Sequence, residues 1–379
     1  MELPSCPASQ YNVSSNKASH VPAGLHRASR LVASTTGLWK ALGNLETRIL
    51  GSGLNSLEIE KPVFVSGVAR SGSTILTEII SRHPETGCHH YSDFPLTWTP
   101  YWWNSLRERL PLPEPQPVER AHRDRLMITP DSPEAIEEVL WMHFFPGAHQ
   151  PHHSHVLAAD NDHPQFEKYY REHIRKLLAV RKRQRYLAKN NYHVTRLEYL
   201  LSLFPDARFV IPVREPVQQV ASLIKQHRLF SEQDAADSRV SRQLRLAGHF
   251  EFGPGRCPIL IEDRRVPHYQ EKSGDVAWYA QQWADVYGFL HARMQANPAL
   301  KNACLTIRYE DLCSEPQQAL QGVFQHLDLD VTASDDIIAS IAPTISAPDY
   351  YDCDFNAVDA ALLRDLTGPT AELFGYPND

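Results

Sequence analysis

The 379-residue sequence lacks paired cysteines, long apolar runs and an excess of basic residues, and each absence removes a class of protein. Its six cysteines show no CxxC spacing, so nothing in the chain resembles a zinc knuckle. In an intracellular chain we expect scattered cysteines of this kind to be free thiols. They are Cys6, Cys88, Cys257, Cys304, Cys313 and Cys353.

Apolar residues do not form any run long enough to cross a membrane. A transmembrane helix needs about 18 consecutive apolar residues, and the sequence contains no such run. The first residues, "MELPSCPASQYNVSSNKASH", are polar and lack the apolar centre of a signal peptide. We therefore expect a cytoplasmic location and no membrane span.

Basic side chains are outnumbered by acidic ones. The 38 Lys and Arg against 45 Asp and Glu give a formal net charge of −7 at pH 7. Proteins that bind nucleic acids usually carry a basic excess, so the balance argues against nucleic acid as a partner and leaves room only for a local basic cleft. Hydrophobic residues make up 42% of the chain, enough to bury a sizeable core.

Apolar strands alternate with helical segments along much of the chain. The segments "KPVFVSGV", "ARFVIPV" and "ACLTIRY" are apolar throughout, as strands buried on both faces are. Each precedes a stretch with helical spacing, which predicts an α/β fold with a parallel β-sheet flanked by helices. The chain shows no internal repeat.

The polar segments of the sequence indicate the limits of the domain and the places of its insertions. Residues 1–20 are polar and predict a disordered tail, and residues 21–379 predict a single domain. Insertions are expected at about 94–185 and 231–275, where Pro, His and polar residues interrupt the pattern of strands and helices.

A helix is also expected near the start of the domain. Residues 24–50 carry apolar side chains at helical spacing, with Leu31, Leu38, Leu42 and Leu45 on one face. This pattern predicts a helix whose apolar face consists of these leucines and Ile49 or Leu50.

The stretch "SGVARSGSTIL", residues 66–76, joins the first apolar strand to a helix and resembles a phosphate-binding loop. Gly67 and Gly72 have the spacing of a G-x-x-x-x-G-K-[ST] loop, and Thr74 supplies its last hydroxyl. The lysine position, however, holds Ser73. Backbone N–H groups at a helix N-terminus still bind an anion without that lysine, and Arg70 offers a planar fork for an oxyanion.

A second part of a nucleoside triphosphatase is also missing. The strand "RFVIPV" ends at Arg214, where an aspartate that holds magnesium is expected. A cation at this point indicates an anionic partner. A nucleotide or small-molecule kinase with a P-loop remains an alternative, but it needs both the lysine and the magnesium ligand.

Together these residues resemble a sulfotransferase that uses PAPS (3′-phosphoadenosine 5′-phosphosulfate) as donor. The family's 5′-phosphosulfate loop P-R-S-G-[ST]-T is similar to "ARSGST", with Ala69 in place of the proline. Its 3′-phosphate motif is an arginine after a strand and a serine eight residues later, as in "VREPVQQVAS". The resemblance implies a P-loop-like sulfotransferase fold and a set of donor-binding residues. These are Arg70, Ser71, Gly72, Ser73, Thr74, Arg214, Ser222 and Tyr309.

The similarity is greatest to the branch that includes tyrosylprotein sulfotransferases and related bacterial sulfotransferases. In that branch a lysine precedes a helix and the segment FP-x-A-[RK], matched here by Lys189 and "FPDARF". "IRYEDL" resembles the family's YEDL segment, which implies that Tyr309 packs on the adenine, and "AELFGY" is similar to the closing LGY.

Sulfuryl transfer needs a cation at the leaving oxygen and a base at the acceptor. Because charge builds on the bridging oxygen as it leaves, Arg70 and Lys189 are the candidate catalytic cations. The base must be a positioned carboxylate or imidazole. The branch has a glutamate after the first helix, but "CHHYSDFP" offers Asp93 or His90 instead, with His89 beside them, and His193 follows Lys189 by four residues.

The resemblance implies an acceptor hydroxyl or amine on a small molecule or peptide. The cluster "HQPHHSH" at 149–155 has no cysteine or acidic ligand at zinc-like spacing, so we interpret it as a loop near the acceptor pocket and expect no metal. A protein that kept the fold and binds PAP or another nucleotide without catalysis is the other alternative, because the expected glutamate is missing.

Overall fold

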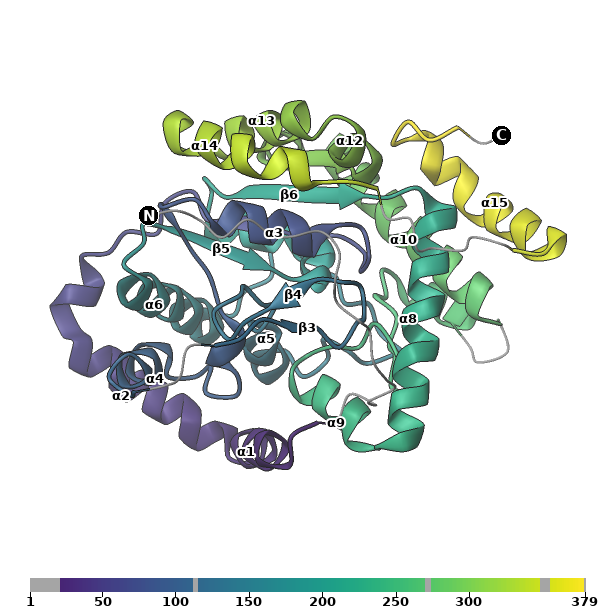
Figure 1. Cartoon of the computed structure of the whole chain (residues 1–379). Coiled ribbons are helices and arrows are strands. Elements are labelled where there is room, and N and C mark those ends of the chain that lie inside the picture. The colour runs from purple at the N-terminus through teal and green to yellow at the C-terminus, as the bar shows by residue number, and fades with distance from the viewer. Residues whose placement is uncertain (1–20, 112–114, 270–273, 348–354, 378–379) are drawn as a thin grey trace.

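The computed structural model describes residues 21–111, 115–269, 274–347 and 355–377, so the predicted tail at 1–20 lies outside the described residues. A parallel sheet forms the centre of the molecule (Figure 1). It has five strands in the order β2–β5–β1–β6–β7. This confirms the predicted α/β fold. The strands are β1 (Val63–Val65), β2 (Thr86–Gly87), β5 (Arg185–Lys189), β6 (Arg208–Val213) and β7 (Cys304–Arg308).

The central strands are apolar on both sides because helices cover both faces of the sheet. Val63 and Val65 point to one face and Phe64 to the other, and all three are fully buried. The first face packs against α3 (Ser73–Ser81), α13 (Pro316–Leu327) and α14 (Val331–Ile341), whose apolar side chains share one buried cluster with Val63 and Val65. The alternation is the one that a pleated strand imposes.

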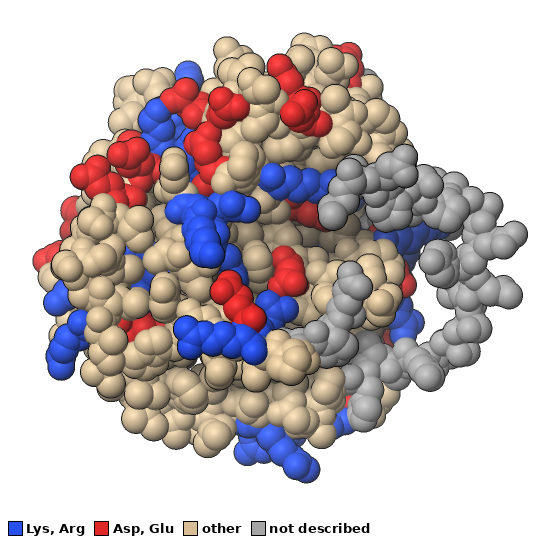
Figure 2. Space-filling view, turned by 60° about the vertical axis from the view of Figure 1, so that its left-hand side comes forward, with Lys and Arg blue, Asp and Glu red and all other residues tan. Residues whose placement is uncertain are grey.

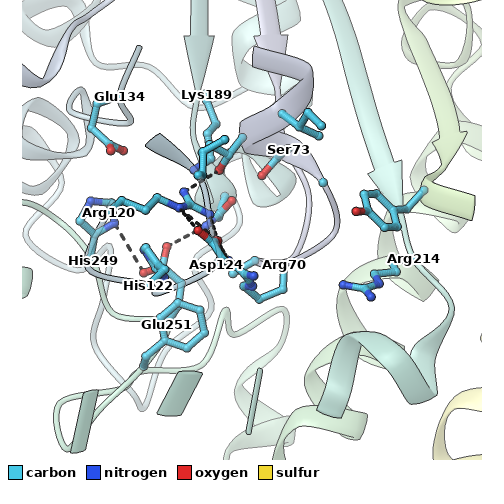
Figure 3. Close-up of a pocket in the computed structure, with 18 of the residues that line it drawn as sticks. Arg70, Ser73, Arg120, His122, Asp124, Glu134, Lys189, Arg214, His249 and Glu251 are labelled. Carbon is cyan, nitrogen blue, oxygen red and sulfur yellow. Dashed lines mark hydrogen bonds and ion pairs between the residues drawn. The ribbon is translucent and has the colours of Figure 1, made fainter. Parts of the chain in front are cut away.

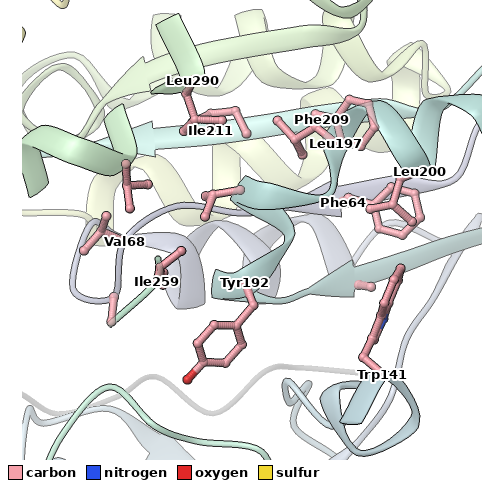
Figure 4. Close-up of a cluster of buried hydrophobic side chains, with 14 of the residues drawn as sticks. Phe64, Val68, Trp141, Tyr192, Leu197, Leu200, Phe209, Ile211, Ile259 and Leu290 are labelled. Carbon is pink, nitrogen blue, oxygen red and sulfur yellow. The ribbon is translucent and has the colours of Figure 1, made fainter. Parts of the chain in front are cut away.

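The opposite face carries the larger core. Phe64, Phe209 and Ile211 meet Trp141 and Leu200 there (Figure 4). Four helices supply most of its covering: α6 (Pro164–Arg181), α7 (Leu197–Leu203), α8 (Pro216–Ala236) and α10 (Gly274–Ala296). The helix α15 (Ala357–Glu372) packs along α10.

The regions predicted as insertions contain short elements of their own. A two-stranded antiparallel hairpin pairs β3 (Val118–Glu119) with β4 (Met127–Ile128). The helices are α4 (Pro100–Arg107), α5 (Glu138–Phe144) and α9 (Arg239–Leu246). Elsewhere the chain forms α11 (Pro298–Ala303), α12 (Tyr309–Ser314) and the short 3-10 helices Tyr91–Asp93, Asn191–Thr195, Asp263–Tyr269 and Ala342–Thr344. The domain division itself stays a prediction.

The predicted N-terminal helix forms as two helices, α1 (Ala23–Ser34) and α2 (Thr36–Asn55), but much of its apolar face is exposed. Leu31 and Leu38 are 61% and 60% exposed. Gly43 lies on the buried side of α2, facing Tyr169 on α6. A Cβ at this position would lie 2.5 Å from the Tyr169 hydroxyl, so only glycine allows the two helices to approach this closely. Close approach of the two helices therefore selects the glycine side over the leucine side.

Charges of both signs are interspersed on the face that Figure 2 shows, in keeping with the near balance of acidic and basic residues. No helix in the described part of the chain is long and apolar enough to cross a membrane. Cys88, Cys257, Cys304 and Cys313, the cysteines within the described ranges, are free thiols as predicted.

Candidate active site

The carboxyl edge of the parallel sheet collects the residues singled out by the sequence. Lys189 is the last residue of β5 and pairs in register with Val65, the last residue of β1. The loop of residues 66–72 follows β1, and Arg214 follows β6. Since these strands are neighbours in the sheet, Lys189, the loop and Arg214 lie in that order along one edge, where α/β folds bind their ligands.

The loop between β1 and α3 has the backbone of an anion-binding turn. Arg70 and Gly72 both have left-handed backbone angles, with φ values of 71° and 101°. Left-handed residues in a loop are typical of backbone turns that bind anions, and the N-terminus of α3, which follows directly, favours an anion as well. A Cβ on Gly72 would lie 2.6 Å from the Tyr309 ring, so glycine is required both by the angle and by the ring that packs on it.

A cavity of about 190 Å³ opens in front of this loop (Figure 3). The predicted residues that line it are Arg70, Gly72, Ser73, Thr74, Lys189, Arg214 and Tyr309. Ser71 and Ser222 are fully buried behind them. Ser222, on α8, accepts a hydrogen bond from Nε of Arg70 at 3.1 Å and so fixes the root of that guanidinium.

Arg214 lies at one end of the cavity, beside Tyr309. Its guanidinium carbon is 4.8 Å from the centre of the Tyr309 ring, and Nη2 donates to Gln218 at 3.1 Å. Its carbonyl accepts from Trp283, so the main chain is held as well. The arrangement presents a fixed, planar cation next to an aromatic ring, which suits a phosphate beside a base.

Lys189 lies on the other side of the loop, half-buried and surrounded by charges. Burial lowers the pKa of its ammonium, an effect that the carboxylate of Glu134 opposes. Glu251 also opposes it, while Arg120 and Arg70 add to the lowering. Because this site is partly shielded from water, a negative charge that forms beside the ammonium would interact with it more strongly than it would in water.

The hairpin of β3 and β4 brings further charges over the loop. Asp124 accepts from Nη1 of Arg70 at 2.8 Å and forms an ion pair with Arg120. Arg120 in turn reaches the hydroxyl of Thr74 at 3.4 Å. The tip of the hairpin is tied to α8, because His122 and Gln226 exchange hydrogen bonds of 3.0 and 2.9 Å. One carboxylate thus holds two guanidinium groups at the anion loop.

The family of the chain follows from its similarity to known proteins. The sequence profile of the sulfotransferase family matches residues 62–257, just over half of the chain. The chain belongs to the sulfotransferase family. The matched segment contains the loop, Lys189, Arg214 and Ser222, and the family is one of enzymes. A search of curated proteins gives no match.

Solved structures of bacterial sulfotransferases have the same fold. The crystal structure of a sulfotransferase from Mycobacterium tuberculosis is 13% identical, with a TM-score of 0.50, over 88% of this chain and 83% of that one. One from Mycobacterium avium is 14% identical, with a TM-score of 0.50, over 86% and 80% of the two chains. At such low identity the likeness concerns the fold alone.

Asp93, a predicted base of this sulfotransferase, does not line the cavity. It is fully buried and accepts hydrogen bonds from His89, Asn104 and Arg181 at 3.1, 2.8 and 2.8 Å. Burial alone would raise the pKa of this carboxyl, but the hydrogen bond and charge of His89 and the charge of Arg181 hold it well below its usual range. These bonds make Asp93 a structural anion, and we do not propose it as the base.

The two histidines predicted as alternatives also lie away from the cavity lining. His193 is fully buried, faces Glu137 and packs edge-on against Phe64. His90 lies 3.9 Å from Asp131, and burial lowers its pKa to about 4. A fully buried ring cannot reach an acceptor, and neither histidine shares the cavity with Lys189, so we do not propose them either.

The cavity instead holds ionisable residues that the sequence did not single out. Glu134 follows the hairpin, and His249 and Glu251 follow α9 (Figure 3). None stands at a fixed spacing from a motif. Their one signal in the sequence is that they fall within the two predicted insertions, at about 94–185 and 231–275.

The histidine-rich loop has a structural role at His149. Nε2 of this ring donates to the carboxylate of the buried Glu138 at 2.6 Å, and the ring stacks on Phe250 with ring centres 4.1 Å apart. Among the residues described, no group of three or more His, Cys, Asp or Glu is arranged to hold a metal ion.

Proposed function

We propose that this sulfotransferase moves a sulfuryl group from PAPS to a hydroxyl or amine of a small-molecule or peptide acceptor and releases PAP. The observation that carries the proposal is the convergence of the anion loop, Lys189 and Arg214 on one cavity, with an arginine in place of a magnesium ligand. The order of Lys189, "FPDARF" and Arg214 supports the branch that includes tyrosylprotein sulfotransferases. Cytoplasmic location stays a prediction.

In this proposal the loop amides and Arg70 bind the 5′-phosphosulfate. Lys189, at the neighbouring strand end, stabilises the charge on the bridging oxygen as the sulfuryl group leaves. The side-chain cations thus provide at this position the charge that magnesium provides in P-loop kinases. Incoming donor competes with Asp124 for Arg70, since both are anions at the same guanidinium.

Arg214 would bind the 3′-phosphate, the group that separates PAPS from ATP, and Tyr309 would pack on the adenine. Ser222 was predicted to share the 3′-phosphate, and its hydroxyl bonds to Arg70 here. We therefore propose that Ser222 links the two phosphate sites by positioning Arg70.

Replacing Arg214 with alanine is expected to weaken PAP binding by about 1.5–3 kcal/mol, which is about 10- to 150-fold in Kd. The reason is the loss of a charged hydrogen bond to the 3′-phosphate. Isothermal titration calorimetry measures the change. The control is Arg82→Ala, an arginine whose side chain is 53% exposed on α3's C-terminal side. Equal PAP affinity in Arg214→Ala and the wild type would contradict the assignment.

Transfer of ³⁵S from labelled PAPS tests the activity itself. The reaction is run in EDTA with a panel of phenols, sugars and amines, and labelled sulfate esters or sulfamates are expected. PAP binding with no transfer to any acceptor, or to water, would favour the non-catalytic alternative. ATP turnover that survives Arg70→Ala would favour the kinase alternative.

A further inference from the structure

We propose that His249 is the general base that deprotonates the acceptor, and that Glu251 positions it. This inference rests on the proposed function, because it assigns a residue to the same reaction. It follows from the side chains that share the cavity with Lys189: His249, Glu251 and Glu134 come from elements that the sequence motifs do not include.

The end of α9 directs His249 into the cavity. The helix stops at Leu246, and Gly248 takes a left-handed backbone with φ of 84°. The N–H of His249 then donates to the carbonyl of Leu244 at 2.9 Å, which closes the helix end. A Cβ on Gly248 would lie 2.7 Å from the side chain of Glu138, so the turn is also fixed by packing.

Glu251 holds one nitrogen of the imidazole. Its Oε2 lies 3.6 Å from Nδ1 of His249, an ion-pair distance, and its Oε1 accepts from Asn191 at 2.8 Å. Its own carbonyl accepts from Tyr279, so the main chain is anchored too. A carboxylate at Nδ1 favours the tautomer with the proton on that nitrogen, which leaves Nε2 as the proton acceptor.

One short segment holds both the cation for the leaving oxygen and the carboxylate next to the proposed base. Asn191, which holds Glu251, follows Lys189 by two residues, just beyond the end of β5. The strand end that places the cation for the leaving oxygen therefore also fixes the carboxylate behind the base. Lys189, His249 and Glu251 all line the same cavity, so the cation and the proposed base can act on one bound donor and acceptor.

Atoms and electrons balance in the proposed step. The acceptor oxygen forms a bond to sulfur and passes its proton to Nε2 of His249. The bond between sulfur and the bridging oxygen of PAPS breaks, and its electron pair stays on the 5′-phosphate of PAP, next to Lys189. The imidazolium formed faces Glu251, and it returns the proton to solvent after the products leave.

Glu134 is the competing base in the cavity, and its surroundings make it a weak one. Burial alone would raise the pKa of Glu134, but the charges of Lys189 and His249 hold it below the ordinary value. Around His249, burial favours the neutral ring, while Glu251 and Glu134 outweigh both burial and Lys189 and raise the pKa of the imidazole. A proton from the acceptor therefore moves to His249 more readily than to Glu134.

The first test compares His249→Gln and Glu134→Gln with the wild type, using ³⁵S-labelled PAPS and the best acceptor of the panel, with water included. We expect His249→Gln to lose about 10²- to 10⁴-fold in kcat with unchanged PAP affinity. Glu134→Gln is expected to lose far less. The control is His152→Gln, an exposed histidine outside the cavity.

The pH profile separates a catalytic role from a structural one. A base acts only when unprotonated, so kcat/KM of the wild type should rise with pH through a value above about 6.5, the ordinary pKa of histidine. Glu251→Gln should lower the pKa of His249, because the imidazolium loses the carboxylate that stabilises it, and the rise in kcat/KM should therefore move to lower pH. A limb below about 4.5 would assign the base to Glu134 and overturn the proposal.

Two further results would overturn the assignment of His249: a wild-type kcat in His249→Gln, or a pH profile of Glu251→Gln that does not shift. Neither result would affect the proposed function as long as the wild type binds PAP and transfers sulfate. A wild type that neither binds PAP nor transfers sulfate to any acceptor or water would overturn both. If His249→Gln fails to fold, the shift in the pH profile of kcat/KM in Glu251→Gln decides whether His249 is the base.

Discussion

Replacement of Lys189 by alanine is expected to reduce kcat by about 10²- to 10³-fold while PAP affinity changes little. The ammonium acts on charge that develops on the bridging oxygen in the transition state, and an interaction made only there raises kcat without tightening ground-state binding. The register of β5 against β1 sets Lys189 directly beside the anion loop, which is where that oxygen would lie.

Single-turnover transfer of ³⁵S and calorimetry with PAP give the two quantities for Lys189→Ala. The control is Lys168→Ala, a lysine on α6 whose side chain is 79% exposed. A thermal melt confirms that the variant is folded, since Lys189 lies among Glu134 and Glu251. Equal losses in turnover and PAP affinity would mean that the lysine serves donor binding and not the leaving group.

Replacement of Asp93 by alanine is expected to lower the free energy of unfolding by about 3–5 kcal/mol without changing kcat of the folded protein. The reason is that Arg181 would lose a carboxylate that accepts two of its hydrogen bonds at 2.8 Å, and His89 would lose its partner at 3.1 Å. Urea unfolding and transfer assays well below the melting temperature measure the two effects.

The pH dependence of this effect follows from the pKa of Asp93, which lies well below its ordinary value in the folded protein. The stabilisation by Asp93 is therefore present above about 3.9 and is lost as pH falls toward its folded pKa. The control is Asp131→Ala, whose side chain is 50% exposed and whose ion pair with Arg107 should contribute at most about 1 kcal/mol. A stable Asp93→Ala with reduced kcat would restore Asp93 as a catalytic residue.

The sequence predicted the residues whose position depends on the sheet. A buried strand, its glycine turn and its helix specify one another locally, and parallel strands bring their ends to one edge. Arg70, Lys189 and Arg214, which the family resemblance assigned to one site, line one cavity because the strands β1, β5 and β6 that precede them end at the same edge.

The residues that the sequence did not predict are placed by long-range contacts. His249 depends on the turn at Gly248 and its contact with Glu138, more than a hundred positions away. Asp93 looked available because it follows the loop helix, but its partner Arg181 comes from the far end of α6. No local pattern records such pairings.

The N-terminal helix shows the same limit in packing. Leucines at helical spacing outlined one face, but Glu46 and Gly43 on the other side meet Lys176, with a buried ion pair of 3.0 Å and a hydrogen bond of 3.0 Å to the Gly43 carbonyl. A hydrophobic pattern alone does not show where two backbones approach closely.

Calorimetric titration with PAP in EDTA tests most directly whether the cavity is a site for 3′-phosphoadenosine nucleotides. PAP should bind without metal, and AMP, which lacks the 3′-phosphate, should bind about 10- to 150-fold more weakly, as expected for one lost charged hydrogen bond. Equal affinities for PAP and AMP, no binding of PAP, or tighter binding of ATP with Mg²⁺ would contradict the account.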